Sequence, residues 1–426
     1  MNALSKDMSG PLALFANRLN TLAGPERQAA AGALARTGLP DRKSEAWHYT
    51  TLRALGKRDY AAPPAQVDDA AVRTLLDEVL HAHPAMAGLP RVVFVNGRYA
   101  PAFSALPDDV ELAFFAQASH FGLQAAPDRD PLVALNTALA EDGLALRVPA
   151  GVDGGHVMLV SLGVAGEQPF SFHPRHMVVL EKAAHLRLIC VQAGRGAYFH
   201  NPVTDIVVED GATLEHVTVQ AEAAQAISLG TLYAHVGHQS VYDSFVLGLG
   251  GQLARHEVHA RLGATRGVVH VNGAQRLAAQ QVGDITSVIT HAASDCTSRQ
   301  TVRNVLDGHA RGVFQGKVLV ERIAQKTDGY QMNQALLLSP DAEIDAKPEL
   351  EIYADDVRCS HGATVGALDD EQLFYLRSRG IPEQEARQML IDAFLDEAIA
   401  LVGDATAQAF CRAVLAARFG GKGDAA

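Results

Sequence analysis

Cysteine is scarce in this chain, and its few cysteines stand apart from one another. The 426 residues include four, at Cys190, Cys296, Cys359 and Cys411. None of them forms a CxxC pair, and the scattered spacing is unlike a disulfide framework or a zinc ribbon. By default each lone cysteine packs as a small buried hydrophobic residue. The cysteines therefore indicate neither a disulfide scaffold nor a metal site built from cysteine alone.

Long apolar runs and an excess of positive charge are also missing. Lys and Arg number 36 against 48 Asp and Glu, which gives a net charge of -12. An acidic chain lacks the basic surface of a general nucleic-acid binder. Residues 1–20 contain no sustained apolar segment of the secretory type, and charges interrupt each later apolar run. With 48% apolar and 20% charged residues, the sequence predicts a globular cytoplasmic protein with neither nucleic acid nor membrane as a partner.

The motifs of common enzyme classes fail on inspection. Gly316-Lys317 suggests a phosphate-binding loop, but Arg311 and Val318 occupy the positions where that motif requires Gly and Ser or Thr. The glycines near position 250 lack the third glycine of a dinucleotide fingerprint, because Leu253 stands there. No Gly-x-Ser-x-Gly nucleophile elbow is present. We therefore expect no nucleotide site in this chain and predict a non-catalytic protein.

His256, Glu257 and His259 imitate a zinc-protease motif only loosely. The true motif places two histidines at i and i+4 on one helical face, whereas this pair is separated by three residues within a predicted strand. Residues at that spacing on a strand point to opposite faces. A shared metal is thus not expected at this trio.

Residues 1–150 are predicted to form a helical region with a small β-hairpin. Pro25 opens one helical segment, and Asp68 or Asp69 leads into another. Asn96-Gly97 lies between two extended runs and is a strong signal for a two-residue hairpin turn. A further short helix is expected from Pro131.

Residues 151–366 are dominated by short β-type runs separated by Gly, Asp and Asn. Three of these runs align, so that Leu186, Leu214 and Val241 recur at steps of 28 and 27 residues. A small-residue turn followed by a strand, repeated at about one coil length, indicates a parallel β-helix or a related solenoid. The repeat is degenerate, and a β-sandwich is the alternative.

Residues 367–426 return to a helical period. Leu373, Phe374 and Leu376 form the apolar positions of one helix that Gly380 ends, and Pro382 begins the next. The region is predicted to be a helical domain of two or three helices. Its acidic face is either solvated surface or a docking face for a partner.

Cys359 and His361 place a thiol and an imidazole on the same face of a predicted strand. Thiolate and imidazole are suitable ligands for iron, zinc and iron-sulfur species. Two ligands do not complete a site, because structural zinc and a [2Fe–2S] cluster each require four. Either the pair packs inside a solenoid, or the missing ligands come from elsewhere, such as another subunit.

Three segments carry a resemblance to a known family. The segment "LLLSPDAEIDAKPELEIYADDVRCSHGATVGALDDEQLFYLRSRGI", Leu336 to Ile381, closely resembles the signature of the SufB/SufD family of iron-sulfur cluster assembly proteins. "RKSEAWHYTTLRAL" from Arg42 and "VFVNGRYAP" from Val93 are similar to the same family. "CSHGATVG" is typical of the SufD branch, whereas SufB has a Glu-rich stretch at that place.

The resemblance implies a right-handed parallel β-helix core between helical regions, and a scaffold that works with SufB and the ATPase SufC. The C-terminal helices would contact SufC, and the strands near Tyr353 to Val365 would pair with SufB. His361 matches the family histidine implicated in holding the nascent cluster or iron at the SufB interface, and Cys359 matches its less certain neighbour. The cluster would be transient and shared with SufB.

Two alternatives remain from the sequence. One is a cytosolic β-helix homodimer that binds metal without partners. The other, suggested by the solenoid pattern alone, is a β-helix carbohydrate-active enzyme.

Overall fold

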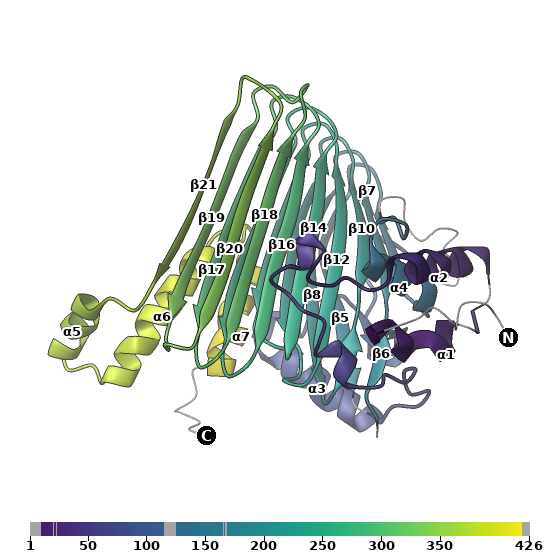
Figure 1. Ribbon diagram of the computed structural model, residues 1–426, viewed down its shortest axis with the longest axis horizontal. Helices are drawn as coiled ribbons and strands as arrows, with labels where there is room; N and C mark the ends of the chain where they lie inside the picture. The colour runs from purple at the N-terminus through teal and green to yellow at the C-terminus, as the bar shows by residue number, and fades with distance from the viewer. Residues whose placement is uncertain are drawn as a thin grey trace.

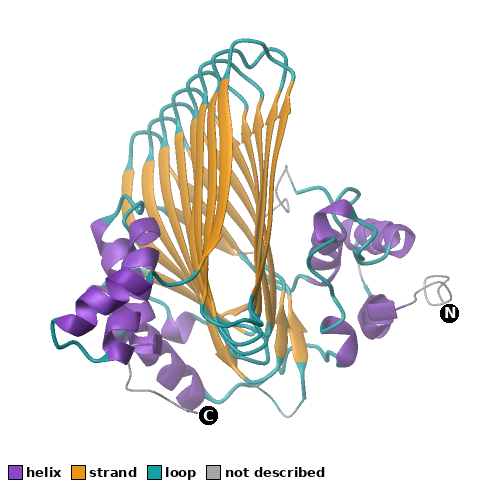
Figure 2. Cartoon of the chain, turned by 60° about the vertical axis from the view of Figure 1, so that its left-hand side comes forward, coloured by secondary structure: helices purple, strands orange, loops and turns teal. Residues whose placement is uncertain are grey.

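The computed structural model describes residues 10–19, 21–22, 24–114, 125–164, 166 and 168–419. Two large β-sheets face each other and form a solenoid of about eight turns, with helices at both ends of the chain packed against it (Figures 1 and 2). The predicted mainly β fold with a solenoid core and flanking helices is therefore confirmed, and the sandwich alternative is not needed.

From β10 onward, successive strands alternate between the two sheets, so each sheet grows by one parallel strand per coil. The ten-stranded sheet has the order β2-β1-β5-β8-β11-β13-β15-β17-β19-β21, and the other contains eleven strands and ends at β20. The first sheet comprises β1 (Arg91–Val95), β2 (Arg98–Tyr99), β5 (Asp153–Val164), β8 (His185–Arg195), β11 (Thr213–Ala221), β13 (Val241–Gly248), β15 (Val268–Leu277), β17 (Thr297–Leu306), β19 (Asp328–Leu337) and β21 (Arg358–Gly366). The second comprises β3 (Glu111–Phe114), β4 (Leu144–Val148), β6 (Phe170–Phe172), β7 (Arg175–Leu180), β9 (Tyr198–His200), β10 (Val203–Val208), β12 (Ile227–Val236), β14 (Leu253–Leu262), β16 (Val282–His291), β18 (Arg311–Val320) and β20 (Glu343–Ile352).

One corner of the solenoid repeats a left-handed backbone residue once per coil. The residues there recur every 27 to 31 positions and all have positive φ; they are Ala183, Gly211, Gln239, Arg266, Asp295 and Lys326. A left-handed residue reverses the chain sharply enough to pass from one sheet to the other. Only one of the six is glycine, so the turn geometry repeats more regularly than the amino-acid types do. This difference explains why the repeat is degenerate in the sequence.

The sequence repeat is right for its first step and wrong by one residue for its second. Leu186 pairs with Leu214 as predicted, but Leu214 pairs with Tyr242 rather than Val241. The alignment of the sequence matches Gly237 with Asp210, and the corner residues show that this match is one residue out of register. The left-handed Gln239 lies two positions after Gly237, whereas the left-handed Gly211 lies one position after Asp210. A shift of one residue exchanges the two faces of a strand. Tyr242 is accordingly fully buried inside the solenoid.

The predicted hairpin is confirmed. β1 and β2 pair antiparallel through Phe94 and Tyr99, with the left-handed residues Asn96 and Gly97 between the strands. β1 also pairs in parallel with β5, so it belongs to the ten-stranded sheet.

The N-terminal helices are α1 (Ala16–Leu19), α2 (Pro25–Thr37), α3 (Asp69–His81) and α4 (Pro131–Leu139). The predicted starts are confirmed: Pro25 opens α2, and the Asp68 side chain accepts a hydrogen bond from the Ala70 amide at the start of α3. Asp130 caps α4 in the same way. These caps satisfy amide groups that would otherwise lack partners at a helix start.

A buried charge network attaches the N-terminal segment to the outer face of the eleven-stranded sheet. Arg255 donates to Glu257 at 2.8 Å and to Asp284 at 2.5 Å, while its guanidinium lies 4.2 Å from the centre of the Trp47 ring. Thr50 also donates to Asp284. Each buried charge thus has an oppositely charged partner on the sheet, and Arg255 and Asp284 also contact the overlying segment, which offsets the cost of removing them from water.

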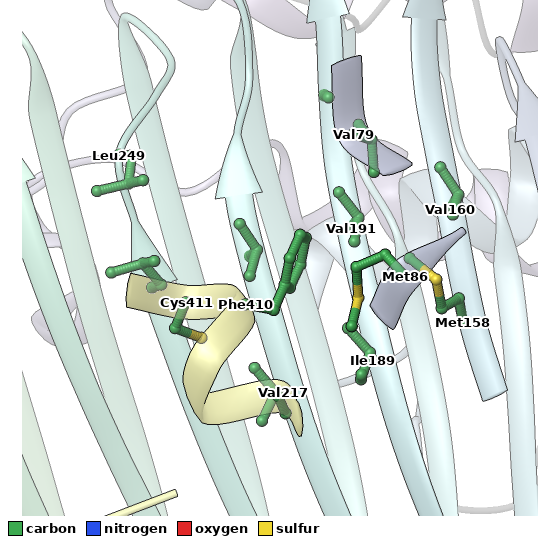
Figure 3. Packing of buried hydrophobic residues seen from close by; sticks show 14 of the residues in the cluster. Val79, Met86, Met158, Val160, Ile189, Val191, Val217, Leu249, Phe410 and Cys411 are labelled. Carbon is green, nitrogen blue, oxygen red and sulfur yellow. The ribbon is translucent and has the colours of Figure 1, made fainter. Parts of the chain in front are cut away.

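The C-terminal helices are α5 (Asp370–Ser378), α6 (Glu383–Ile399) and α7 (Ala405–Phe419). The predicted boundary is confirmed, because Gly380 has positive φ and Pro382 caps α6. Helix α7 places Phe410 and Cys411 against Val217, Leu249 and their neighbours on the outer face of the ten-stranded sheet (Figure 3). Helix α5 instead extends beyond the sheet (Figure 1).

Truncation of the buried Phe410 tests whether this contact fixes the C-terminal helices. Phe410 is fully buried, and we expect Phe410→Ala to lower the free energy of unfolding by about 3–5 kcal/mol through lost burial and a new cavity. Denaturant titration of the two proteins measures the change. Phe374→Ala is the matched control, since 73% of Phe374 is exposed and surface substitutions change stability by about 0.5 kcal/mol or less. Equal effects would contradict this role for Phe410.

Candidate metal site at the open end of the solenoid

Strand β21 is the last strand of the ten-stranded sheet and carries both predicted ligands. It pairs with β19 along one edge, and it ends the strand order of the sheet. Strand β20 ends the other sheet in the same way. The solenoid therefore finishes in two neighbouring edge strands, whose free backbone groups are able to pair with another chain.

The register of β21 confirms that Cys359 and His361 share one face. Cys359 lies opposite Gly329 of β19, and His361 lies opposite Gln331. Gln331 is fully buried within the solenoid. Residues paired across a parallel ladder project from the same side of the sheet, so Cys359 and His361 lie on the inward side.

Cys359 is half-buried and packs at the end of the core. Its neighbours are the apolar side chains of Val318, Val320 and Ala354. Burial raises the pKa of the Cys359 thiol above its ordinary value, Asp328 adds to this effect, and the Gly329 amide opposes it. A protonated thiol is a weak ligand, because metals bind the thiolate. The environment of Cys359 thus favours packing in the isolated chain.

His361 differs from its neighbour because it is exposed. Among the residues that the structure describes, none forms a hydrogen bond or an ion pair with its imidazole. The ring nitrogens are therefore free to bind a ligand that arrives at the open end.

The two residues do not make a complete metal site. Over the described ranges, no group of three or more His, Cys, Asp or Glu side chains is placed to hold a metal ion. This agrees with the ligand count from the sequence, since a closed site needs about four donors. An incoming cluster or iron fits this end of the solenoid only if a second chain supplies the remaining ligands.

His256, Glu257 and His259 divide between the two faces of β14, as the sequence predicted. His256 lines an interior cavity, whereas Glu257 accepts a hydrogen bond from His259 at 2.8 Å on the outer face. Glu257 belongs to the buried network around Arg255. The trio therefore has a structural place in the fold and does not converge on one point.

Sequence reasoning missed a polar contact inside the solenoid. The Cys190 sulfur lies 3.3 Å from His216 Nε2, and both residues line an enclosed cavity of about 60 Å³. Burial raises the pKa of Cys190 to about 12 and lowers that of His216 to about 3. Both groups are therefore neutral at pH 7. The strands that carry Cys190 and His216 are one coil apart, so the repeat predicts that they are neighbours in the sheet. No short sequence motif, however, indicates that these two side chains make contact.

Sequence reasoning also missed the buried amides behind His361. Gln300, Gln331 and His361 occupy equivalent places on β17, β19 and β21. Their spacing of 31 and 30 residues is the feature of the sequence that relates these three residues. The repeat found in the sequence covers only earlier coils, in which the steps are shorter.

A solenoid with helices at both ends, which carries a thiol and an imidazole on its free terminal strand, defines the structural class of this protein. The comparisons with known proteins identify the family. "SUF system FeS cluster assembly, SufBD core domain" matches residues 163–394, and "SufBD protein N-terminal region" matches residues 14–156. The chain belongs to the SufB/SufD family.

Two relatives support this assignment, and the first of them is a SufD protein. The chain is 34% identical to the iron-sulfur cluster assembly protein SufD of Escherichia coli over 391 residues, which cover 88% of each chain. It is 31% identical to an iron-sulfur cluster assembly SufBD family protein of Synechocystis sp., with 92% of this chain and 90% of the relative covered. The protein is thus a SufD-like member of an iron-sulfur cluster assembly family. Within the described residues, no helix has the length and apolar character needed to span a membrane.

Thiol alkylation tests the environment of Cys359. Because the thiolate is the reacting form and each unit of raised pKa reduces its population about tenfold, Cys359 should react with iodoacetamide more slowly than a free thiol at pH 8. It should still react roughly tenfold or more faster than the fully buried Cys411, whose pKa is raised to about 12. Peptide mass spectrometry over time gives both rates, and guanidinium-unfolded protein is the control. Reaction of Cys359 faster than free cysteine would contradict the assignment.

Proposed function

We propose that this chain is the SufD-type scaffold subunit of a SUF complex, and that it builds nascent iron-sulfur clusters with SufB and the ATPase SufC. The observation that carries the proposal is the exposed His361 on the inward face of a terminal strand that is paired on one side only. The relative from Escherichia coli is named as an assembly protein of this kind. In this proposal the chain has no catalytic role, and ATP hydrolysis belongs to SufC.

The open end of the solenoid supports pairing with SufB. Apolar side chains are exposed beside the edge strands, with 64% of Tyr353 and 55% of Val365 accessible. Exposed apolar groups next to free strand edges are typical of surfaces that another chain covers. A partner that continues the stack would bring its own side chains to His361 and complete the ligand set. The cluster or iron is the cargo of this shared site.

Helix α5 supports docking of the ATPase. It projects beyond the ten-stranded sheet (Figure 1), and Phe374 and Tyr375 are 73% and 57% exposed. Arg379 lies over the Tyr375 ring at 5.0 Å and donates to its hydroxyl at 3.1 Å. Aromatic and arginine side chains together are enriched at the energetic centres of protein interfaces.

Substitution of His361 tests the cluster site. In the complex co-purified with SufB and SufC and reconstituted anaerobically, His361→Ala should remove most of the bound iron and sulfide while the subunits still assemble. The subunits should assemble because His361 is exposed and has no partner to lose in the isolated chain. Iron and sulfide analysis of the purified complex gives the result. His309→Ala, at another exposed histidine in the loop between β17 and β18, is the control. A complex with normal cluster content after His361→Ala would refute the site.

Substitution on α5 tests the docking surface. Phe374→Asp should weaken capture of SufC at least about 30-fold, which corresponds to the roughly 2 kcal/mol that a central aromatic contact contributes. Binding to SufB should be unchanged. Ile323→Asp is the control, since Ile323 is similarly exposed at 69% in the loop between β18 and β19.

The size and the metal content of the protein distinguish the scaffold from the homodimer alternative. A homodimer that binds metal alone should keep its size and metal content when SufC is present or absent. Size-exclusion chromatography with and without SufC therefore separates the two hypotheses, because the scaffold should form a larger species with the ATPase.

A further inference from the structure

The two coils behind His361 carry buried amide side chains in line with it. Gln300 of β17 pairs with Gln331 of β19, and Gln331 pairs with His361 of β21. These strands are neighbours at the end of the sheet (Figure 1). Adjacent strands lie about 4.8 Å apart. The imidazole of His361 is therefore the last member of an inward-facing row whose preceding members are amides.

Gln331 is buried without a hydrogen-bond partner. It is fully buried, and neither its Oε1 nor its Nε2 atom finds a partner among the described residues. Leaving such groups unsatisfied destabilises the fold, because they have lost their hydrogen bonds to water. Gln300, one coil further inside, lacks a partner in the described part of the chain only at Nε2, because its Oε1 accepts a hydrogen bond from Ser287 at 2.5 Å. The unsatisfied amide thus lies next to the proposed ligand.

A glycine on the facing sheet provides the space for these amides. A Cβ atom at Gly316 of β18 would lie 3.0 Å from both Gln300 Oε1 and Gln331 Nε2, and 2.7 Å from the Phe314 ring. Any larger residue would crowd the glutamines. Gly316 therefore allows Gln331 to extend into the solenoid interior.

A histidine that binds a metal needs a second partner. When one ring nitrogen of a neutral imidazole is the ligand, the other carries a proton and acts as a donor. An acceptor for that proton fixes the ring orientation and increases its basicity as a ligand. Around His361, the neighbouring amide oxygen of Gln331 is an acceptor whose hydrogen-bonding capacity is unused.

We propose that Gln331 is a positioning residue for His361, and that its Oε1 accepts a hydrogen bond from the non-ligating N–H of the imidazole when cargo is bound. The inference rests on the proposed role of His361 as a ligand. It explains why an unsatisfied amide is kept in the interior: the amide gains its partner only when the imidazole turns to bind iron.

The test compares Gln331→Met with Gln300→Met in the complex of this chain with SufB and SufC, loaded with ferrous iron and sulfide. Methionine has a similar length and is flexible, but it offers the imidazole no strong acceptor. Loss of a supporting hydrogen bond typically weakens metal binding about 10- to 100-fold. We therefore expect Gln331→Met to release iron to a chelator about 10- to 100-fold faster than the wild-type complex. Gln331→Glu, which retains an acceptor oxygen, should slow the release again.

Thermal stability separates positioning from packing. Removal of an unsatisfied amide should leave the melting temperature of the Gln331→Met chain unchanged or raise it. Gln300→Met should lower the melting temperature, because it breaks the contact with Ser287, and should leave the release rate unchanged. If Gln331→Met does not assemble with its partners, Gln331→Asn gives the same comparison, since its shorter side chain withdraws the oxygen from His361.

Two results would overturn the inference. One is a wild-type release rate in the Gln331 variant, and the other is equal acceleration by the Gln331 and Gln300 variants, which would indicate general disturbance of the interior. Neither result affects the proposed function, because the cluster site is tested separately by the iron and sulfide content of His361→Ala.

Discussion

The structure depends on one constraint, which is that a stack of parallel strands must end somewhere. Every strand inside the solenoid is satisfied by a strand above and below it, but β20 and β21 have a partner on one side only. At this end the protein therefore has backbone groups available to another chain. His361 lies on this terminal strand, so the free edge and the proposed ligand occupy the same place.

The interior of the last coils is more polar than a structural core requires. Buried polar side chains there pair across and along the solenoid: His291 with Ser298 at 2.9 Å, Asn304 with Asn333 at 2.8 Å, and Ser287 with Gln300. Such groups cost free energy unless they are satisfied. Within the described residues, the pairing leaves one amide atom of Gln300, Asn304 and Asn333 without a partner, whereas both amide atoms of Gln331 lack one. Among these buried polar side chains, Gln331 therefore has the fewest hydrogen bonds, and it lies next to the open end of the solenoid.

Much of the fold follows from local signals in the sequence. The helix starts at Asp68 and Pro25, the turn at Asn96-Gly97 and the stop at Gly380 act within a few residues, and each is confirmed. The coil register was harder to predict, because it depends on a left-handed corner residue that is glycine in one coil and Gln239 in the next. The face shared by Cys359 and His361 was predictable, since it needs only the period of a strand.

The unsatisfied state of Gln331 was not predictable in this way. It depends on the absence of a side chain at Gly316 on the facing sheet and on the position of Gln331 in the next-to-last strand. Neither property is contained in the residues adjacent to Gln331 in the sequence. Contacts between coils about 30 residues apart decide them.

Part of each outer face of the solenoid is already covered by other segments of the chain (Figures 1 and 2). The N-terminal segment is fixed to one sheet through Trp47 and Thr50, and α7 is fixed to the other through Phe410. These contacts use buried aromatic rings and buried charges, which are costly to expose again. A partner is therefore met with less reorganisation at the terminal strands and at α5, where the exposed aromatic side chains lie. The end of the stack therefore combines free strand edges with an exposed His361, while Gln331 on the preceding strand stays buried.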